Sequence, residues 1–345
     1  MAQINQDKID KILNQSYKKS PQEQVDLDIQ YSDIDNIGNK EDIIAMIKNV
    51  AKYNNMLKES ITFINNDLTA LIPFTKENLY LICGYSGNGK STIAANVSYP
   101  LWQEGKKSLV ITNEESREDV YFRIACLHLG YNFNGYKKGT MPATQQKECV
   151  LLFHSIAAYV KVADVNFKYG DIENATATIE GVKALMSSVK NSDYSCVMLD
   201  YYQLIKKSIN KPDTSSYEAL NDFRIWLGQF MKRAEIPIVI FAQLHSLGKR
   251  NNKDLDSRIK HCPDIYETST VVIEVVPNFE ESTSDFAIVK DRFGFAGKRI
   301  TCAFEKGRYV NLSQDAIGKI RDQKVTDMIT VIDGEPSLEE EKDDQ

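Results

Sequence analysis

The chain has 345 residues, of which 42% are hydrophobic, and this size suits one large globular domain with appendages or two small domains. Its formal net charge is −6, and residues 333–345 hold seven acidic residues and one basic residue, so the remainder is near neutral. This balance excludes nucleic-acid binding through bulk positive charge and leaves only local basic loops for that purpose. We expect the acidic tail to be disordered, with a role as an interaction tail as the alternative.

Six cysteines are scattered along the chain, and no two are spaced as C-x-x-C. Several lie inside apolar runs that are typical of strands. This pattern predicts reduced, buried thiols and argues against a zinc site or a disulfide framework. The sequence has no signal peptide and no apolar run near the roughly 20 residues that span a bilayer, so we expect no membrane association.

Residues 1–60 are polar and acidic, and we expect a helical extension there. Helical spacing of apolar residues occurs at 9–17 and at 42–57, and the charged stretch 23–42 between them is typical of a linker. The second helix is expected to dock either on a neighbouring subunit or on its own domain.

Residues 84–92 read Gly-Tyr-Ser-Gly-Asn-Gly-Lys-Ser-Thr and fit the phosphate-binding pattern G-x-x-x-x-G-K-[ST]. An apolar run at 78–83 precedes them and a helical pattern at 91–102 follows. Glycines allow the backbone to wrap around a phosphate chain, and the amides of the loop and of the helix start point at the anion. The pattern assigns nucleotide binding to Gly84, Ser86, Gly87, Asn88, Gly89, Lys90, Ser91 and Thr92, with the Ser91 hydroxyl on Mg²⁺.

From residue 76 onward the pattern alternates between short apolar runs and helical segments. The runs at 108–112, 195–200, 236–243 and 271–276 predict a mostly parallel sheet with helices on both faces. Alternating runs at 286–291, 299–304 and 308–312, with glycines between them, predict antiparallel hairpin strands. We therefore expect an α/β core over residues 61–312 and a C-terminal extension over 313–345.

Acidic residues end two of these predicted strands. Asp200 ends the run at 195–200, where an acid that orients Mg²⁺ is needed in a P-loop enzyme, but Tyr201 follows it. Glu114 and Glu115 end the run at 108–112, and strand C-termini converge on the ligand crevice of an open sheet. Either glutamate can then polarise the attacking water, although acids at this position also simply favour a helix start.

Gln243 ends the next predicted strand and is placed to sense the γ-phosphate. The following segment, 246–260, has five basic and two acidic residues, and a second basic segment follows Asp200. Clustered cations on one edge of the sheet suit a phosphodiester backbone, with solvated surface charge as the alternative. The candidate nucleic-acid contacts are Lys206, Lys207, Lys211, Lys249, Arg250, Lys253 and Arg258.

Lys290 and Arg292 precede a glycine-rich turn, and their i, i+2 spacing on a strand places them on one face. A cation pair at a hairpin tip can be inserted into a neighbour's nucleotide site, where a trans arginine speeds phosphoryl transfer by roughly 10³–10⁵. A surface charge pair is the alternative.

Together these segments resemble the RecA-like core of the DnaB family of hexameric replicative helicases, including those in phage helicase-primases. The resemblance covers residues 67–309, and its markers are the segments 84–92, 113–116, 199–204, 241–245, 256–258 and 290–292. It implies ATP or another NTP with Mg²⁺, Glu114 as catalytic base and Glu115 as second candidate, Lys90 on phosphate, Asp200 on the metal, Gln243 as sensor, and Lys290 with Arg292 completing a neighbour's site.

The resemblance also implies a cytoplasmic hexamer of a bacterial or phage-infected cell that moves along single-stranded DNA, with a primase or helicase loader as a further partner. The chain departs from the family in having His245-Ser246 where Asn-Arg is common, and it shows no primase domain or full helical collar. The alternatives are a RecA-type recombinase filament, a KaiC-like regulatory ATPase and a binding module with an inactive site.

Overall fold

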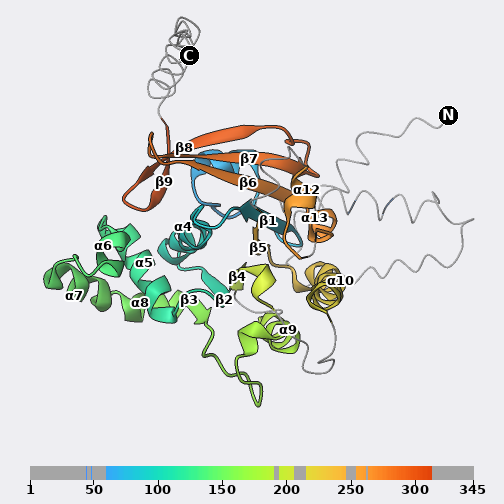
Figure 1. Cartoon of the computed structure of the whole chain (residues 1–345), viewed down its shortest axis with the longest axis horizontal. Helices are drawn as coiled ribbons and strands as arrows, with labels where there is room; N and C mark the ends of the chain where they lie inside the picture. Colours follow the sequence, from blue (N-terminus) through green and yellow to red (C-terminus); the bar gives the residue numbers. More distant parts are fainter. Residues whose placement is uncertain are drawn as a thin grey trace, which may run out of the picture.

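The computed structural model describes residues 60–189, 194–205, 215–245, 254–261 and 263–312, together with Ile44 and Lys48, which are helical. The described chain is built around one nine-stranded sheet in the order β3-β2-β4-β5-β1-β6-β7-β8-β9 (Figure 1). The expected helices at 9–17 and 42–57 lie outside the described residues apart from Ile44 and Lys48, and the acidic tail lies outside them as well.

Six strands form the parallel part of the sheet, and their apolar sequences explain their burial on both faces. They are β1 (Leu79–Gly84), β2 (Lys107–Thr112), β3 (Val160–Ala163), β4 (Tyr194–Asp200), β5 (Ile238–Gln243) and β6 (Val271–Asn278). All six residues of β1 are buried. Because these strands run in one direction, the ends of β1, β2, β4 and β5 converge on one edge, as the sequence predicts.

The C-terminal strands are antiparallel, which confirms the prediction from their alternating pattern. They are β7 (Thr283–Asp291), β8 (Arg299–Glu305) and β9 (Arg308–Asn311). In the pairing of β6 with β7, Val271 lies opposite Asp291 and Val272 lies opposite Lys290. This register decides at which edge of the sheet Lys290 and Arg292 lie.

Strand β3 is absent from the elements that the sequence predicts. It has four residues, follows the helix that ends at Tyr159 directly, and pairs with β2 alone within the described sheet. A short apolar run that continues a helical segment has no turn residues to separate the two structures, so periodicity does not distinguish them.

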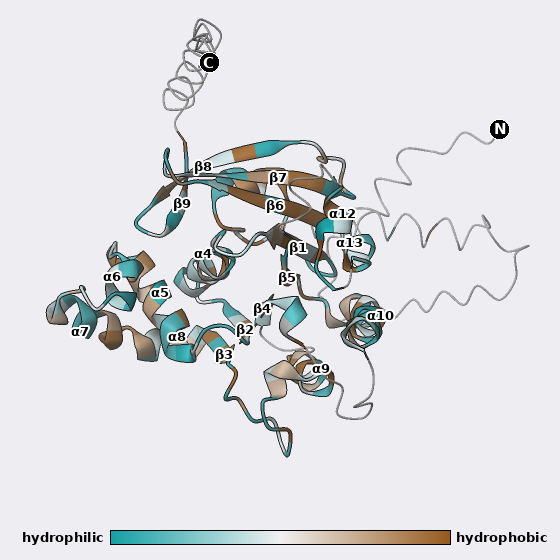
Figure 2. Ribbon diagram, in the orientation of Figure 1, coloured by the Kyte–Doolittle hydropathy of each residue, from teal (hydrophilic) through white to brown (hydrophobic). Residues whose placement is uncertain are grey.

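Helices cover both faces of the sheet and give two apolar cores. One core contains α4 (Lys90–Gln103) and α5 (Arg117–Leu129), and the other contains α9 (Ile179–Ser188) and α10 (Ser216–Ala234). The shorter helices are α3 (Asn66–Leu71), α6 (Phe133–Lys137), α7 (Ala143–Leu151), α8 (Phe153–Tyr159), α12 (Leu255–Arg258) and α13 (Ile265–Thr268). Hydrophobic residues follow the strands, and hydrophilic residues follow the outer sides of the helices (Figure 2).

The cysteines Cys83, Cys126, Cys149, Cys196 and Cys302 are all buried free thiols, as the sequence predicts; Cys262 lies outside the described residues. Burial raises the pKa of each of these five thiols, which keeps them protonated. Among the described helices, none has both the length and the apolar character that a membrane crossing requires.

Candidate nucleotide site

The loop at 84–89 connects β1 to α4, and its glycines adopt backbone angles that other residues rarely take. Gly87 has φ +82° and Gly89 has φ +78°. A Cβ atom on Gly89 would also lie 3.0 Å from the hydroxyl of Tyr309. Gly89 is the N-cap of α4 and offers no side chain to its first amides. The loop therefore leaves the helix N-terminus open to an anion.

The Lys90 side chain is buried and lies back along the loop. Its Nζ donates to the carbonyl oxygens of Gly84 at 3.4 Å and Tyr85 at 3.1 Å. Burial lowers the pKa of Lys90, and the nearby carboxylates of Asp200 and Glu114 oppose this shift. The lysine is thus held by neutral carbonyls that a phosphate oxygen can replace as a stronger partner.

Ser91 and Asp200 meet between α4 and the end of β4. The Ser91 hydroxyl donates a hydrogen bond to the Asp200 carboxylate, whose pKa burial raises to about 7. Asp200 is 3% exposed, and within the described part of the chain its Oδ1 has no hydrogen-bond partner. A buried carboxylate oxygen without a partner, next to a hydroxyl, fits a divalent cation that takes its other ligands from phosphate and water. Accordingly, the described residues contain no group of three or more His, Cys, Asp or Glu side chains that could hold a metal alone.

The two glutamates after β2 have different environments. The Thr112 hydroxyl accepts from the backbone amides of both Glu114 and Glu115 at 3.2 Å and so fixes the turn. The Glu115 carboxylate is paired with Arg123 of α5, whose guanidinium also donates to the Thr92 hydroxyl at 3.1 Å. Glu114 is exposed, and its charge acts on Lys90 and Asp200. The geometry therefore favours Glu114 over Glu115 as the carboxylate available to a water molecule.

These groups line a cavity of about 240 Å³. It contains most of the residues that the sequence assigns to nucleotide and catalysis: Ser86, Gly87, Gly89, Lys90, Ser91, Thr92, Glu114 and Gln243, together with Glu115. Gly84 and Asn88 belong to the loop but not to the lining, since the Asn88 amide donates to the carbonyl of Val275 at 3.0 Å.

Sequence reasoning missed two residues of this cavity, Arg123 and Tyr201. Arg123 lies 4.0 Å from the centre of the Phe133 ring, and its buried Nε has no partner among the described residues. Its spacing of eight residues from Glu115, about two helical turns, is the signal that could have indicated the pair. The Lys90 ammonium lies 5.8 Å from the centre of the Tyr201 ring.

Gln243 is connected to the base of the segment that follows it through Gln203, which is 7% exposed. The Gln203 amide donates to the carbonyls of Gln243 at 3.1 Å and Lys260 at 3.2 Å, and its oxygen accepts from the Gln243 amide at 3.1 Å. Lys260 also donates its backbone amide to the Gln243 carbonyl. The end of β5 and the end of the segment 246–260 therefore share one hydrogen-bond network.

Arg258 lies inside the protomer rather than on an open loop. Its guanidinium forms two hydrogen bonds with the Glu274 carboxylate, at 2.8 and 3.0 Å, and one with the Tyr85 hydroxyl at 3.0 Å. Its role in nucleic-acid binding stays a prediction, and this arrangement also links the segment 246–260 to the phosphate loop. The other candidate nucleic-acid contacts lie outside the described residues: Lys206, Lys207, Lys211, Lys249, Arg250 and Lys253.

Lys290 and Arg292 lie together at the opposite edge of the sheet from the phosphate loop. Lys290 Nζ donates to the carbonyls of Tyr266 and Glu267 at 2.7 and 2.9 Å, and Arg292 donates to that of Glu267 at 3.0 Å. The Arg292 amide bonds Thr270, whose amide bonds Leu79 at the start of β1. Since β1 reaches the phosphate loop five residues later, the two edges are about 16 Å apart along the strand. These cations do not reach the cavity of their own protomer.

Comparison with known proteins gives one family and a consistent fold. The model of the DnaB-like helicase C terminal domain matches residues 60–310. The ATPase domain of a phage helicase has a similar structure, with a TM-score of 0.63 and 16% identity, covering 79% of this chain and 99% of that one. A DnaB-like replicative helicase, solved in a study of its interactions with primase, has a TM-score of 0.61 and 15% identity, covering 89% and 77%. Among curated protein sequences, none matches this chain.

Proposed function

Because the chain belongs to the family of DnaB-like helicases, whose members are NTP-dependent enzymes of DNA replication, we propose that it is an ATP-driven motor. In this proposal it assembles as a hexameric ring, moves along single-stranded DNA and separates the strands of a duplex at a replication fork. The observation that carries the proposal is the division of the site: phosphate-binding and water-activating groups lie at one edge of the sheet, and Lys290 with Arg292 lies at the other.

At the first edge, each residue has a distinct task. The amides of residues 87–91 bind the phosphates, and Lys90 exchanges its carbonyl partners for phosphate oxygens. Ser91 and Asp200 hold Mg²⁺, which when bound neutralises phosphate charge and orients the chain of phosphates. Glu114 accepts the proton of the attacking water, while Arg123 holds Glu115 away from that role.

At the second edge, Lys290 and Arg292 complete the site of a neighbouring copy. Both are held by backbone carbonyls, and burial together with Arg292 lowers the pKa of Lys290. Their donors stabilise the charge that develops on the transferred phosphoryl group. A contact between two different surfaces of the same protein closes into a ring when the rotation between copies permits it. A hexamer with nucleotide sites between subunits follows from this arrangement.

Coupling to DNA runs from Gln243 through Gln203 to Lys260. Loss of the γ-phosphate changes the partners of the Gln243 side chain, and the shared carbonyls transmit the change to the segment 246–260. In the proposal, the basic residues of this segment and of 206–211 hold the single-stranded DNA backbone. A primase or a helicase loader is the proposed further partner, because one structural neighbour was solved in a study of its interactions with primase.

The experiment that tests the proposal is ATP-dependent unwinding of a forked duplex by the full-length protein. Lys90→Ala is the inactive control, and Lys147→Ala, which changes an exposed lysine on α7, is the matched control that retains activity. Strand separation that requires both ATP and Lys90 is the expected result. Hydrolysis that single-stranded DNA stimulates without unwinding would favour a recombinase filament, and hydrolysis indifferent to DNA would favour a regulatory ATPase; either result overturns the helicase.

A further inference from the structure

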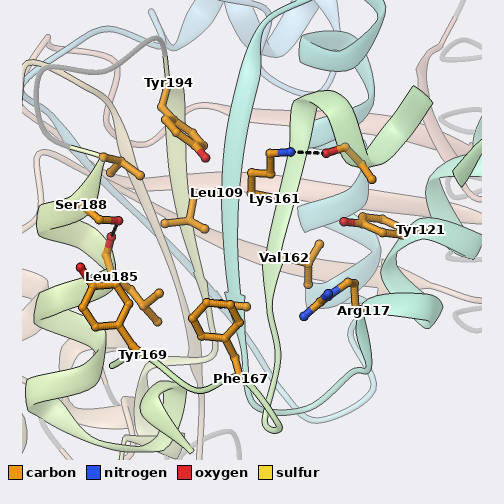
Figure 3. Close-up of a pocket in the computed structure, with 13 residues that line it drawn as sticks. Leu109, Arg117, Tyr121, Lys161, Val162, Phe167, Tyr169, Leu185, Ser188 and Tyr194 are labelled. Carbon is orange, nitrogen blue, oxygen red and sulfur yellow. Dashed lines mark hydrogen bonds between the residues drawn. The ribbon is translucent and has the colours of Figure 1, made fainter. Parts of the chain in front are cut away.

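The largest described cavity does not belong to the nucleotide site. It has a volume of about 430 Å³, which falls within the range of roughly 300–1,000 Å³ that is typical of ligand pockets. It lies around strand β3, with side chains of α9 and Tyr169 on one side and Arg117 and Tyr121 on the other (Figure 3). We call it the β3 groove, and its floor is formed by β2 and β3.

Strand β3 is one of the two edge strands of the sheet, with β2 as its single neighbour among the described strands. An edge strand presents backbone groups that are not paired within the sheet and can accept an additional strand. The groove extends over both faces of this edge, so alternate side chains of an added strand would each meet a wall.

The two walls of the β3 groove differ in chemistry. On the α9 side, Leu109, Leu185 and Val189 belong to one apolar core, and Phe167 packs against it partly buried. On the α5 side, the exposed Arg117 lies beside Val162, and Tyr121 donates its hydroxyl to the Val160 carbonyl at 3.2 Å. A strand with apolar residues at alternate positions and polar residues between them would therefore fit in one orientation.

The charge of the groove selects acidic residues for those polar positions. Its thirteen lining residues include two cations, Arg117 and Lys161, and no carboxylate. The Lys161 ammonium donates to the Ala157 carbonyl at 2.6 Å, and within the described chain no carboxylate lies in ion-pair distance of the Arg117 guanidinium. A buried apolar wall next to an available guanidinium favours a segment that alternates apolar and acidic residues.

The sequence of this protein contains such a segment. Residues 25–31 read Val-Asp-Leu-Asp-Ile-Gln-Tyr, with apolar residues at every odd position and acids at 26 and 28. We propose that residues 25–31 occupy the β3 groove, paired with β3, with their apolar side chains toward α9 and their carboxylates toward Arg117. The 28 residues from 32 to 59 can extend about 90 Å, which allows the segment to reach the groove of its own or of a neighbouring copy.

Hydrogen exchange in the full-length protein tests this proposal by reporting the backbone amides of Val160–Ala163. We expect the Asp26→Lys, Asp28→Lys double variant and the Arg117→Glu variant each to raise the exchange rate roughly tenfold, because each turns two attractions into repulsions. The combination of all three substitutions should restore the original rate. The matched control is Asp33→Lys with Asp35→Lys, which changes the same charge at positions of the opposite parity outside the segment, and it should leave the rate unchanged.

The proposal fails if the rate is the same in all variants, if the combination does not restore protection, or if the control raises the rate as much. Protection of β3 that persists in the Asp26→Lys, Asp28→Lys variant would mean that another segment or partner occupies the groove. A second measurement does not depend on charge. Asp28→Cys with Arg117→Cys should form a disulfide under mild oxidation more readily than Asp33→Cys with Arg117→Cys, and equal yields would overturn the assignment. A disulfide within one chain or between two chains supports it and identifies which copy supplies the segment.

Discussion

The two edges of the sheet hold their charged groups in different ways. At the phosphate loop, Lys90, Asp200, Glu114 and the Glu115–Arg123 pair surround one cavity and act on each other's charge. At the tip of the β7–β8 hairpin, Lys290 and Arg292 contact neutral carbonyls of α13. The first region balances its charges within the protomer, whereas the second presents net positive charge to its surroundings. Two regions that need each other for phosphoryl transfer thus face away from each other in one copy.

The largest expected effect comes from separating these two regions in different copies. Arg292→Ala should lower ATP turnover by roughly 10³, because the trans arginine is absent from every site. Glu114→Gln should be similarly inactive for a reason at the other edge. A mixture of the two variants should recover part of the activity, since some interfaces then combine an intact Glu114 with an intact Arg292. The measurement is steady-state ATP turnover over a range of mixing ratios.

The mixture has two controls. Arg292→Ala mixed with Lys290→Ala should recover little, because both variants damage the same half of the site. Each variant must also assemble with itself to the same extent as the unmodified protein. If no mixing ratio raises activity above that of the separate variants, the two regions do not share a site.

A smaller effect distinguishes the two glutamates of the nucleotide edge. Glu114→Gln should slow single-turnover hydrolysis by about 10²–10⁴ and leave the melting temperature unchanged, because Glu114 is exposed. Glu115→Gln should slow hydrolysis by less than about tenfold and destabilise the fold by about 1–3 kcal/mol, since Arg123 then loses a partner while largely buried. Thermal unfolding and single-turnover rates measure both. The opposite assignment, with Glu115→Gln the slower enzyme, would identify Glu115 as the base.

The sequence predicts those parts of the molecule that depend on residues close together in the chain. The phosphate loop, the strands on both sides of it and the acid at the end of β4 all follow from local patterns. The hairpin with Lys290 is predicted as well, but its position at the opposite edge depends on the register of β6 with β7. Arg123, Gln203 and strand β3 were missed because their partners are distant or their segments are short.

The smallest expected effect tests how the nucleotide edge reaches the segment 246–260. Gln203→Leu removes the three hydrogen bonds that join Gln243 to Lys260 and should lower stability by about 1–3 kcal/mol. We expect basal ATP turnover within about threefold of the unmodified protein and loss of its stimulation by single-stranded DNA. Gln203→Glu keeps the acceptor for the Gln243 amide but loses the donor to both carbonyls, so it should also lose stimulation. Full stimulation in both variants would mean that the coupling runs through another contact, of which the Arg258 pair with Tyr85 and Glu274 is the next to test.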